Sequence, residues 1–198
     1  MGPRLTFWFE LASTYSYLSA MRIDALAEAA GVEVDWRPVP LGPIFALQGW
    51  KTSPFNIYAA KGAYMWRDME RICAARELPF QRPAPFPQNS IRAARVALAA
   101  LETPQGPEFV RALYSAQFAY GADIALPEVI VTALEEVGLP ALLMEAAGSP
   151  MYKERLKDNS AEAVSLGLFG APSFTVGTEV FWGDDRLEDA LDWAKVNV

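Results

Sequence analysis

Five hydroxyl-bearing side chains stand together in the stretch FWFELASTYSYL, residues 7–18, where an apolar run gives way to a polar turn. They are Ser13, Thr14, Tyr15, Ser16 and Tyr17. A short hydroxyl at the start of a helix accepts a hydrogen bond from an unpaired backbone N–H, so Ser13 or Thr14 is predicted to cap a helix. Partial positive charge of the backbone also gathers at that end of a helix. The same hydroxyl is therefore placed to bind or hold an anion.

The sequence contains no histidine and a single cysteine, Cys73. Catalytic triads that need histidine and metal sites ligated by histidine are therefore excluded, and so are a Cys-x-x-Cys redox centre and an intrachain disulfide. Cys73 lies in RDMERICAARE, which has helical periodicity, so its thiol is predicted to pack in the core rather than to act as a nucleophile. Any thiol chemistry has to use a thiol from another molecule.

Composition narrows the class of protein further. A chain of 198 residues with 52% apolar content can bury a core as one domain, or as one domain with a substantial insertion. A net charge of -7 without a dense Lys/Arg cluster argues against a nucleic-acid partner. No apolar run reaches the roughly 18 residues of a membrane span, and the N-terminus lacks the core of a signal peptide. We therefore expect no membrane partner and a cytoplasmic location.

The first forty residues predict a β-α-β unit. A strand over residues 4–9 leads through the polar turn into a helix over 14–30 that Gly31 ends, and an alternating strand follows over 32–39. This order implies a right-handed crossover and a parallel pair of strands. The proline-rich segment 38–56 then marks a boundary, with a helical turn at 43–48. Apolar periodicity predicts helices over 57–77, 90–102, 107–119, 127–137, 140–147 and 150–166.

The C-terminal segment returns to strands. Residues 173–177 and 179–183 predict a hairpin, and a last helix over 184–196 begins where Asp184 can cap it. The fold class is therefore α/β: a thioredoxin-like domain, β-α-β and β-β-α, over residues 1–42 and 168–198, interrupted by an inserted all-α domain over residues 43–167. Pro172 stands before the third strand, where such folds keep a cis proline.

Five short segments in this order resemble one known family, the 2-hydroxychromene-2-carboxylate isomerases. These proteins are relatives of the kappa-class glutathione transferases and, more distantly, of DsbA-like disulfide oxidoreductases. The resemblance covers nearly the whole chain. The segments that carry it are FWFELASTYSYL, RPVPLGPIF with PFN, FPQNS, FGAPSF and FWGDDRL.

The resemblance implies that Ser13 is the catalytic residue. It occupies the position of the reactive cysteine of thioredoxins, and its hydroxyl would donate a hydrogen bond to the sulfur of bound glutathione and favour the thiolate. A helix N-terminus lowers the pKa of a thiol, which agrees with the chemistry expected from the residues alone. Thr14 replaces the proline that usually follows the family serine, and adds a second hydroxyl near the sulfur.

The other glutathione contacts are likewise implied by the resemblance. The backbone of Ala171, beside a cis bond to Pro172, would pair with the cysteinyl part of the tripeptide, although Pro172 could instead simply begin an edge strand. The γ-glutamyl end would lie at the start of the last helix; the alternative there is an ordinary Asp N-cap, and the two roles can hold together. The residues at that end are Trp182, Gly183, Asp184 and Asp185.

On the substrate side, the resemblance places Asn56, Gln88 and Asn89 near an aromatic substrate. A lysine that the family carries after the second strand has no counterpart here, and the nearest amine is Lys51. Aromatic residues are dense over 45–66, where most pack in the core and a few are expected to line an apolar cleft.

The expected function is a glutathione-dependent isomerisation of a small aromatic or conjugated carboxylate through a transient glutathione adduct. Two alternatives stay open: a kappa-class-like transferase, which leaves glutathione on its product, and a thioredoxin-like binding protein without catalysis. The resemblance also implies a homodimer.

Overall fold

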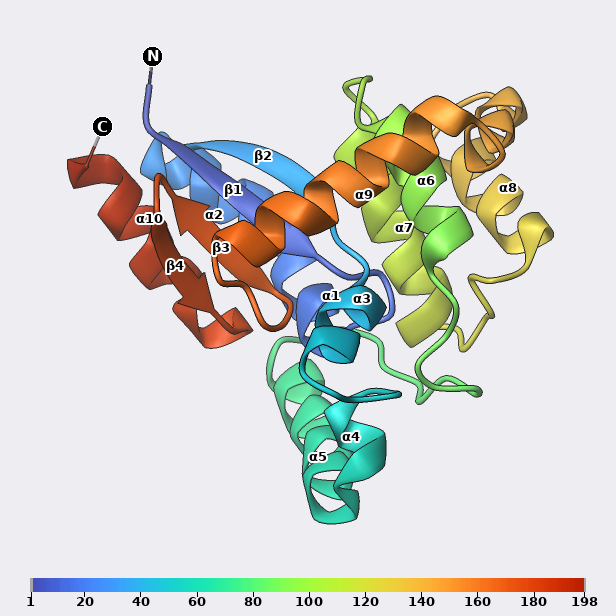
Figure 1. The fold of residues 1–198 in the computed structure, drawn as a ribbon, viewed down its shortest axis with the longest axis horizontal. Coiled ribbons are helices and arrows are strands. Elements are labelled where there is room, and N and C mark those ends of the chain that lie inside the picture. Colours follow the sequence, from blue (N-terminus) through green and yellow to red (C-terminus); the bar gives the residue numbers. More distant parts are fainter. Residues whose placement is uncertain (1, 198) are drawn as a thin grey trace.

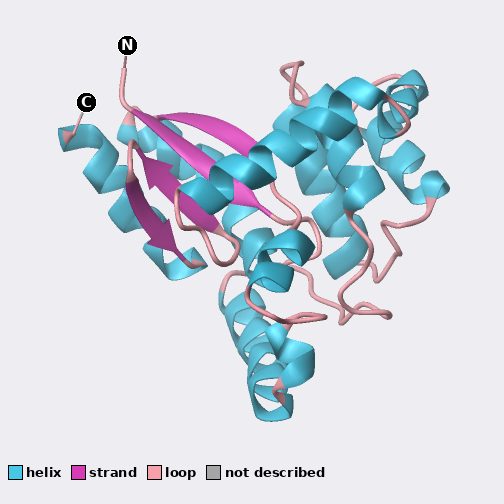
Figure 2. Cartoon of the chain, in the orientation of Figure 1, coloured by secondary structure: helices cyan, strands magenta, loops and turns pink. Residues whose placement is uncertain are grey.

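A four-stranded sheet in the order β2-β1-β3-β4 organises the computed structural model, which describes residues 2–197 (Figures 1 and 2). β1 (Arg4–Phe9) runs parallel to β2 (Glu33–Pro38). β3 (Ser173–Val176) is antiparallel to β1, and β4 (Glu179–Trp182) is antiparallel to β3. The predicted β-α-β and β-β-α arrangement of a thioredoxin-like fold is confirmed.

Alternation along β1 divides its side chains between the two faces of the sheet. Phe7 and Phe9 belong to the main core, where the Phe7 ring lies 5.4 Å from that of Phe174 on β3. Trp8 belongs to a second cluster, together with Ile44 and Ala163. Both faces of the sheet are therefore buried, which explains why the strand reads as a continuous apolar run.

The predicted helix over residues 14–30 is wrong in one respect, because the structure has α1 (Thr14–Ala20) followed by α2 (Ile23–Ala30). The chain breaks at Arg22, whose φ of -132° is not helical. From this position the guanidinium group reaches Asp184, a residue of the C-terminal segment. A partner so far along the chain cannot be seen in the local helical pattern.

The segment between the two halves of the sheet is helical, as predicted. It contains α3 (Leu41–Leu47), α4 (Pro54–Ile57), α5 (Ala59–Ala75), α6 (Ile91–Ala100), α7 (Gly106–Phe118), α8 (Pro127–Glu136), the 3-10 helix η1 (Ala141–Ala147) and α9 (Pro150–Ser165). Figure 1 shows α9 crossing the sheet while α4 and α5 project away from it. The chain then ends with the 3-10 turn η2 (Asp184–Arg186) and α10 (Leu187–Val196). Within residues 2–197, none of these helices combines the length and the apolar character that crossing a bilayer requires.

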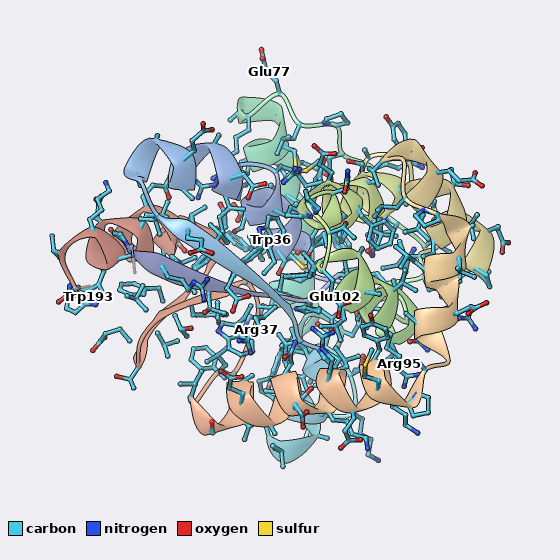
Figure 3. All side chains as sticks on the ribbon, turned by 90° about the horizontal axis from the view of Figure 1, so that it is seen from above. Trp36, Arg37, Glu77, Arg95, Glu102 and Trp193 are labelled. Atoms are coloured by element: carbon cyan, nitrogen blue, oxygen red, sulfur yellow. The ribbon has the colours of Figure 1, made fainter. Side chains whose placement is uncertain are left out.

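The sheet and the helical segment share one hydrophobic core. Trp36 of β2, labelled in Figure 3, packs its ring against Phe7 and Phe9 at 5.0 and 5.7 Å. The same core continues into α6 and α7 through buried residues such as Val96 and Phe109. One hydrophobic core therefore extends across both predicted domain boundaries, 42/43 and 167/168. That residues 43–167 form a domain that folds separately stays a prediction.

We predict that Phe174→Ala lowers the free energy of unfolding by about 3–5 kcal/mol, because the ring is fully buried against Phe7. Phe181→Ala on the neighbouring strand is the matched control, since that ring is only partly buried. Urea denaturation followed by circular dichroism measures both. Equal losses in the two variants would contradict the assignment of Phe174 to the core.

Candidate functional site

A cavity of about 900 Å³ opens where the two halves of the chain meet. Its wall is formed by the N-terminal end of α1, the segment before β3, the turn after β4, the loop from α3 to α4, one side of α5 and the connector 86–91. Apolar groups make up most of the exposed wall, and the polar groups among them include four carboxylates and two ammonium groups. This combination is typical of a site for a small organic ligand.

Ser13 lies in this wall as the N-cap of α1, as predicted. Its Oγ accepts a hydrogen bond from the Ser16 N–H at 3.2 Å and donates one to the Ala171 carbonyl oxygen at 3.0 Å. The Ala171–Pro172 bond is cis, also as predicted. Because Pro172 leads into the interior strand β3, the alternative that it simply begins an edge strand is excluded.

Ala171 presents its backbone to the same cavity. Its carbonyl oxygen faces Ser13 Oγ, while its N–H makes no hydrogen bond within residues 2–197. A free backbone N–H beside a cavity can pair with an extended peptide in the manner of an added strand. The helix N-terminus, the serine hydroxyl and this N–H together form a site for an anionic atom on a peptide-like ligand.

Asp184 does not cap the last helix, and this corrects the sequence-based expectation. Its carboxylate is 5% exposed and accepts hydrogen bonds from Ser19 Oγ at 2.9 Å, Arg22 Nε at 3.2 Å and Arg76 at 2.8 Å. This one buried carboxylate therefore binds groups from α1, from the break between α1 and α2, and from the end of α5, all of which are distant from Asp184 in the sequence. Asp184 therefore fixes the position of η2 beside the cavity, and its carboxylate is already fully engaged.

Backbone N–H groups at this turn, and the carboxylate of Asp185, remain available to a ligand. Gly183 donates its N–H to Pro172 O at 3.0 Å, whereas the N–H groups of Asp184 and Asp185 have no acceptor within residues 2–197. The Asp185 carboxylate is exposed, and among the described residues 2–197 its one ion-pair partner is Arg186, at 3.3 Å. Gly183 has a φ of +110°, and a Cβ there would lie 2.6 Å from Asp185 Oδ1, so this turn requires glycine.

Two aromatic rings border the cavity next to this turn. Trp182, at the end of β4, is half-exposed, and its ring centroid lies 4.8 Å from that of Phe169. Gly170 permits this arrangement, because a Cβ there would lie 2.6 Å from Trp182 Nε1. The sequence analysis did not assign Phe169 to the site, although it is the first residue of the FGAPSF motif and could have been identified from that.

The three residues expected on the substrate side are placed differently from one another. Asn56 is exposed, is not part of the cavity wall, and donates to Thr52 Oγ1 and Phe86 O, both at 3.3 Å. Gln88 lines the cavity, but its amide is held by Ala122 O and the Ile124 N–H. Asn89 is exposed at the cavity and accepts from the Ile91 N–H.

Two buried ionisable groups lie in or near this region. Burial raises the pKa of Glu10, even though its carboxylate accepts hydrogen bonds from the Leu41 and Ala12 N–H groups at 2.8 and 3.2 Å. These bonds tie the turn before Ser13 to the start of α3. Cys73 is 1% exposed, and burial raises its thiol pKa to about 11. The only thiol of the chain is therefore a core residue, as predicted.

Comparisons with known proteins agree with this fold. Residues 4–192 match the DSBA-like thioredoxin domain family. A 2-hydroxychromene-2-carboxylate isomerase of Sphingobium xenophagum is 31% identical over 190 residues, which cover 95% of this chain and 96% of that protein. Glutathione S-transferase kappa 1 of Homo sapiens is 28% identical over 207 residues, with 95% and 90% covered. A solved structure of a 2-hydroxychromene-2-carboxylate isomerase superposes with a TM-score of 0.85 at 24% identity, covering 96% of this chain and 93% of that one.

We predict that Asp184→Asn lowers the free energy of unfolding by about 3 kcal/mol, because Arg22 and Arg76 lose the charge that they share. Asp185→Asn is the matched control on the adjacent residue, and it should change the stability little, because its pair with Arg186 is exposed to solvent. Urea denaturation of both variants measures the difference. Similar small losses in the two would contradict the anchoring role of Asp184.

We predict that Cys73 of the folded protein reacts very slowly with Ellman's reagent at pH 8. With a pKa of about 11, about one thiol in a thousand is ionised at that pH, and the side chain is buried as well. The same protein in concentrated urea should react at the rate of free cysteine. Rapid labelling of the folded protein would contradict the assignment.

Proposed function

The chain belongs to the DSBA-like thioredoxin domain family and, within it, to the group of the 2-hydroxychromene-2-carboxylate isomerases and kappa-class glutathione transferases; on this premise we propose that it is a glutathione-dependent isomerase of an aromatic or conjugated carboxylate. One observation carries the proposal. Ser13 Oγ lies at the N-terminal end of α1, within 3.0 Å of the carbonyl oxygen that precedes the cis proline, in the wall of a cavity large enough for two small molecules.

The residues of the cavity fit glutathione. The unpaired Ala171 N–H suits the cysteinyl backbone, and the free N–H groups of Asp184 and Asp185 suit the γ-glutamyl carboxylate. The Asp185 carboxylate is the acidic group available to the γ-glutamyl amine, since that of Asp184 is engaged by two arginines. When bound, glutathione supplies the nucleophilic sulfur that a chain with one buried cysteine lacks.

Ser13 would hold the negative charge on that sulfur. Its hydroxyl carries one proton, which in the structure is directed at Ala171 O, and rotation about the Cα–Cβ bond redirects it into the cavity. The Ser16 N–H donates to the same oxygen, which polarises the hydroxyl further. The N-terminal end of α1 adds its partial positive charge. Thr14, buried at the next position, would contribute packing and a second hydroxyl to this turn.

The remaining wall suits a flat apolar substrate. Aromatic rings of Phe45, Trp50, Phe55 and Phe86 line the cavity, and Asn89 is one of two exposed amides in the wall, with Gln48. We keep Asn89, with Gln88 behind it, as the proposed polar contacts of the substrate. Asn56 is not assigned to the substrate, because it lies outside the cavity wall and its amide joins Thr52 to the connector.

A second candidate reaction is supported by the similarity to glutathione S-transferase kappa 1. Both reactions would use the same serine and the same cofactor site, so geometry alone does not separate them. The product does: an isomerase returns free glutathione, whereas a transferase retains the thioether. Mass spectrometry of the product after many turnovers at limiting glutathione distinguishes the two.

We predict that Ser13→Ala lowers turnover about a hundredfold and raises the thiol pKa of bound glutathione toward that of the free thiol, because a hydrogen-bond donor to the developing charge is lost. The thiolate absorbance near 240 nm, titrated against pH, measures the pKa. Ser53→Ala is the matched control: Ser53 also lines the cavity and caps a helix, α4, with its Oγ accepting from the Phe55 N–H.

Both variants lose one helix cap, at a cost of about 1 kcal/mol of stability each. Only Ser13→Ala should change the thiol pKa and turnover. If Ser13→Ala and the unmodified protein have the same thiol pKa and the same turnover, the proposed role of Ser13 is refuted. If the unmodified protein binds no glutathione, the chain is the non-catalytic binding protein.

A further inference from the structure

The charged side chains in the cavity wall divide into those that already have partners and those that do not. Each of the four carboxylates has a partner in the structure, although the pair that Asp185 makes is exposed and leaves that carboxylate available to a ligand. Glu10 accepts from two backbone N–H groups, and Asp68 accepts from the Tyr15 hydroxyl at 3.0 Å and from Arg71 at 3.1 Å. Asp184 and Asp185 pair with arginines.

The two ammonium groups in the wall, those of Lys51 and Lys61, have no such partner. Within residues 2–197 neither has a carboxylate within 4.0 Å, although the protein as a whole carries a net charge of -7. Lys61, on α5, has its Nζ 5.6 Å from the centre of the Phe55 ring. Uncommitted positive charge beside an aromatic cavity indicates that an anionic ligand completes the site.

Of the two, Lys61 already lies over the Phe55 ring, whereas Lys51 directly follows Trp50, an aromatic residue of the cavity wall. The chain leaves α3 through Gly49, whose φ is +79°, and the Trp50 N–H then donates to Phe45 O at 2.9 Å. This turn packs the Trp50 ring against that of Phe45 at 5.7 Å, and both rings line the cavity. Lys51 is the next residue, so one short turn supplies an aromatic surface and a positive charge side by side.

We infer that Lys51 is a specificity-determining residue that binds the carboxylate of the substrate while the substrate ring lies against Trp50 and Phe45. The inference rests on the proposed function, because it takes the anion to be an aromatic carboxylate rather than the glutathione that occupies the Ser13 end of the cavity. The ammonium contributes a charge-assisted hydrogen bond that a neutral ligand of the same shape cannot use. Lys51 takes no part in bond making or breaking, so its effect falls on affinity.

Binding of 2-naphthoate and of its neutral amide, 2-naphthamide, tests this inference on the full-length protein saturated with glutathione. The unmodified protein should prefer the carboxylate, and Lys51→Gln should weaken its binding about tenfold or more while leaving the amide unchanged. Lys61→Gln, the other unpaired lysine of the wall, is the matched control and should keep the preference. Calorimetry gives each dissociation constant without any need for turnover.

Kinetics with 2-hydroxychromene-2-carboxylate provide a second measurement. Lys51→Gln should raise KM by about the same factor with little change in kcat, and Lys51→Arg should restore most of the loss. The inference is overturned if Lys51→Gln keeps the preference for the carboxylate, or if it loses affinity for the amide as much as for the carboxylate. Weaker binding of glutathione by Lys51→Gln would overturn it as well. If the unmodified protein binds naphthoate through Lys51 but converts no substrate, the proposed function fails while this inference stands.

Discussion

The hydrogen bond from Ser13 Oγ to the Ala171 carbonyl oxygen joins two residues 158 positions apart, and the geometry of the site depends on it. One partner is the N-cap of α1, and the other precedes the cis proline that leads into β3. The bond holds the hydroxyl where the helix N-terminus, the Ala171 backbone and the cavity meet. Because β1 and β3 are adjacent strands, their backbone pairing places the two segments side by side.

Charge is distributed around the cavity so that anchoring and binding use different groups. Asp184 is buried beneath two arginines and holds η2 in place, whereas Asp185, one residue later, remains exposed. A buried carboxylate is tolerated only when partners compensate its lost hydration, and those partners leave it nothing to offer a ligand. Lys51 and Lys61 are the reverse case, since they are exposed and have no carboxylate to neutralise them within the described residues 2–197.

Predictions from local pattern agree with the structure where no distant partner intervenes, and they fail where a distant partner changes the local outcome. The strands, the Ser13 cap and the burial of Cys73 all follow from short-range periodicity and capping chemistry. The break at Arg22 and the engagement of Asp184 depend on partners 162 and 108 positions away, which no local window contains. Asn56 lies outside the cavity because its amide hydrogen-bonds to the connector, at Phe86 O.

The sequence by itself determined which chemistry is excluded. One cysteine and no histidine exclude an internal redox pair and a histidine base, so thiol chemistry has to use a thiol from another molecule. The family resemblance implied that Ser13 would serve such a thiol, and that role stays a proposal. Only the tertiary structure decided which charged groups remain available in the cavity. The composition gives the number of charged residues but not which of them form pairs, because pairing depends on the tertiary structure. Folding brings α1 and the end of α5 to the buried carboxylate of Asp184, and it leaves Lys51 and Lys61 without a carboxylate partner within residues 2–197.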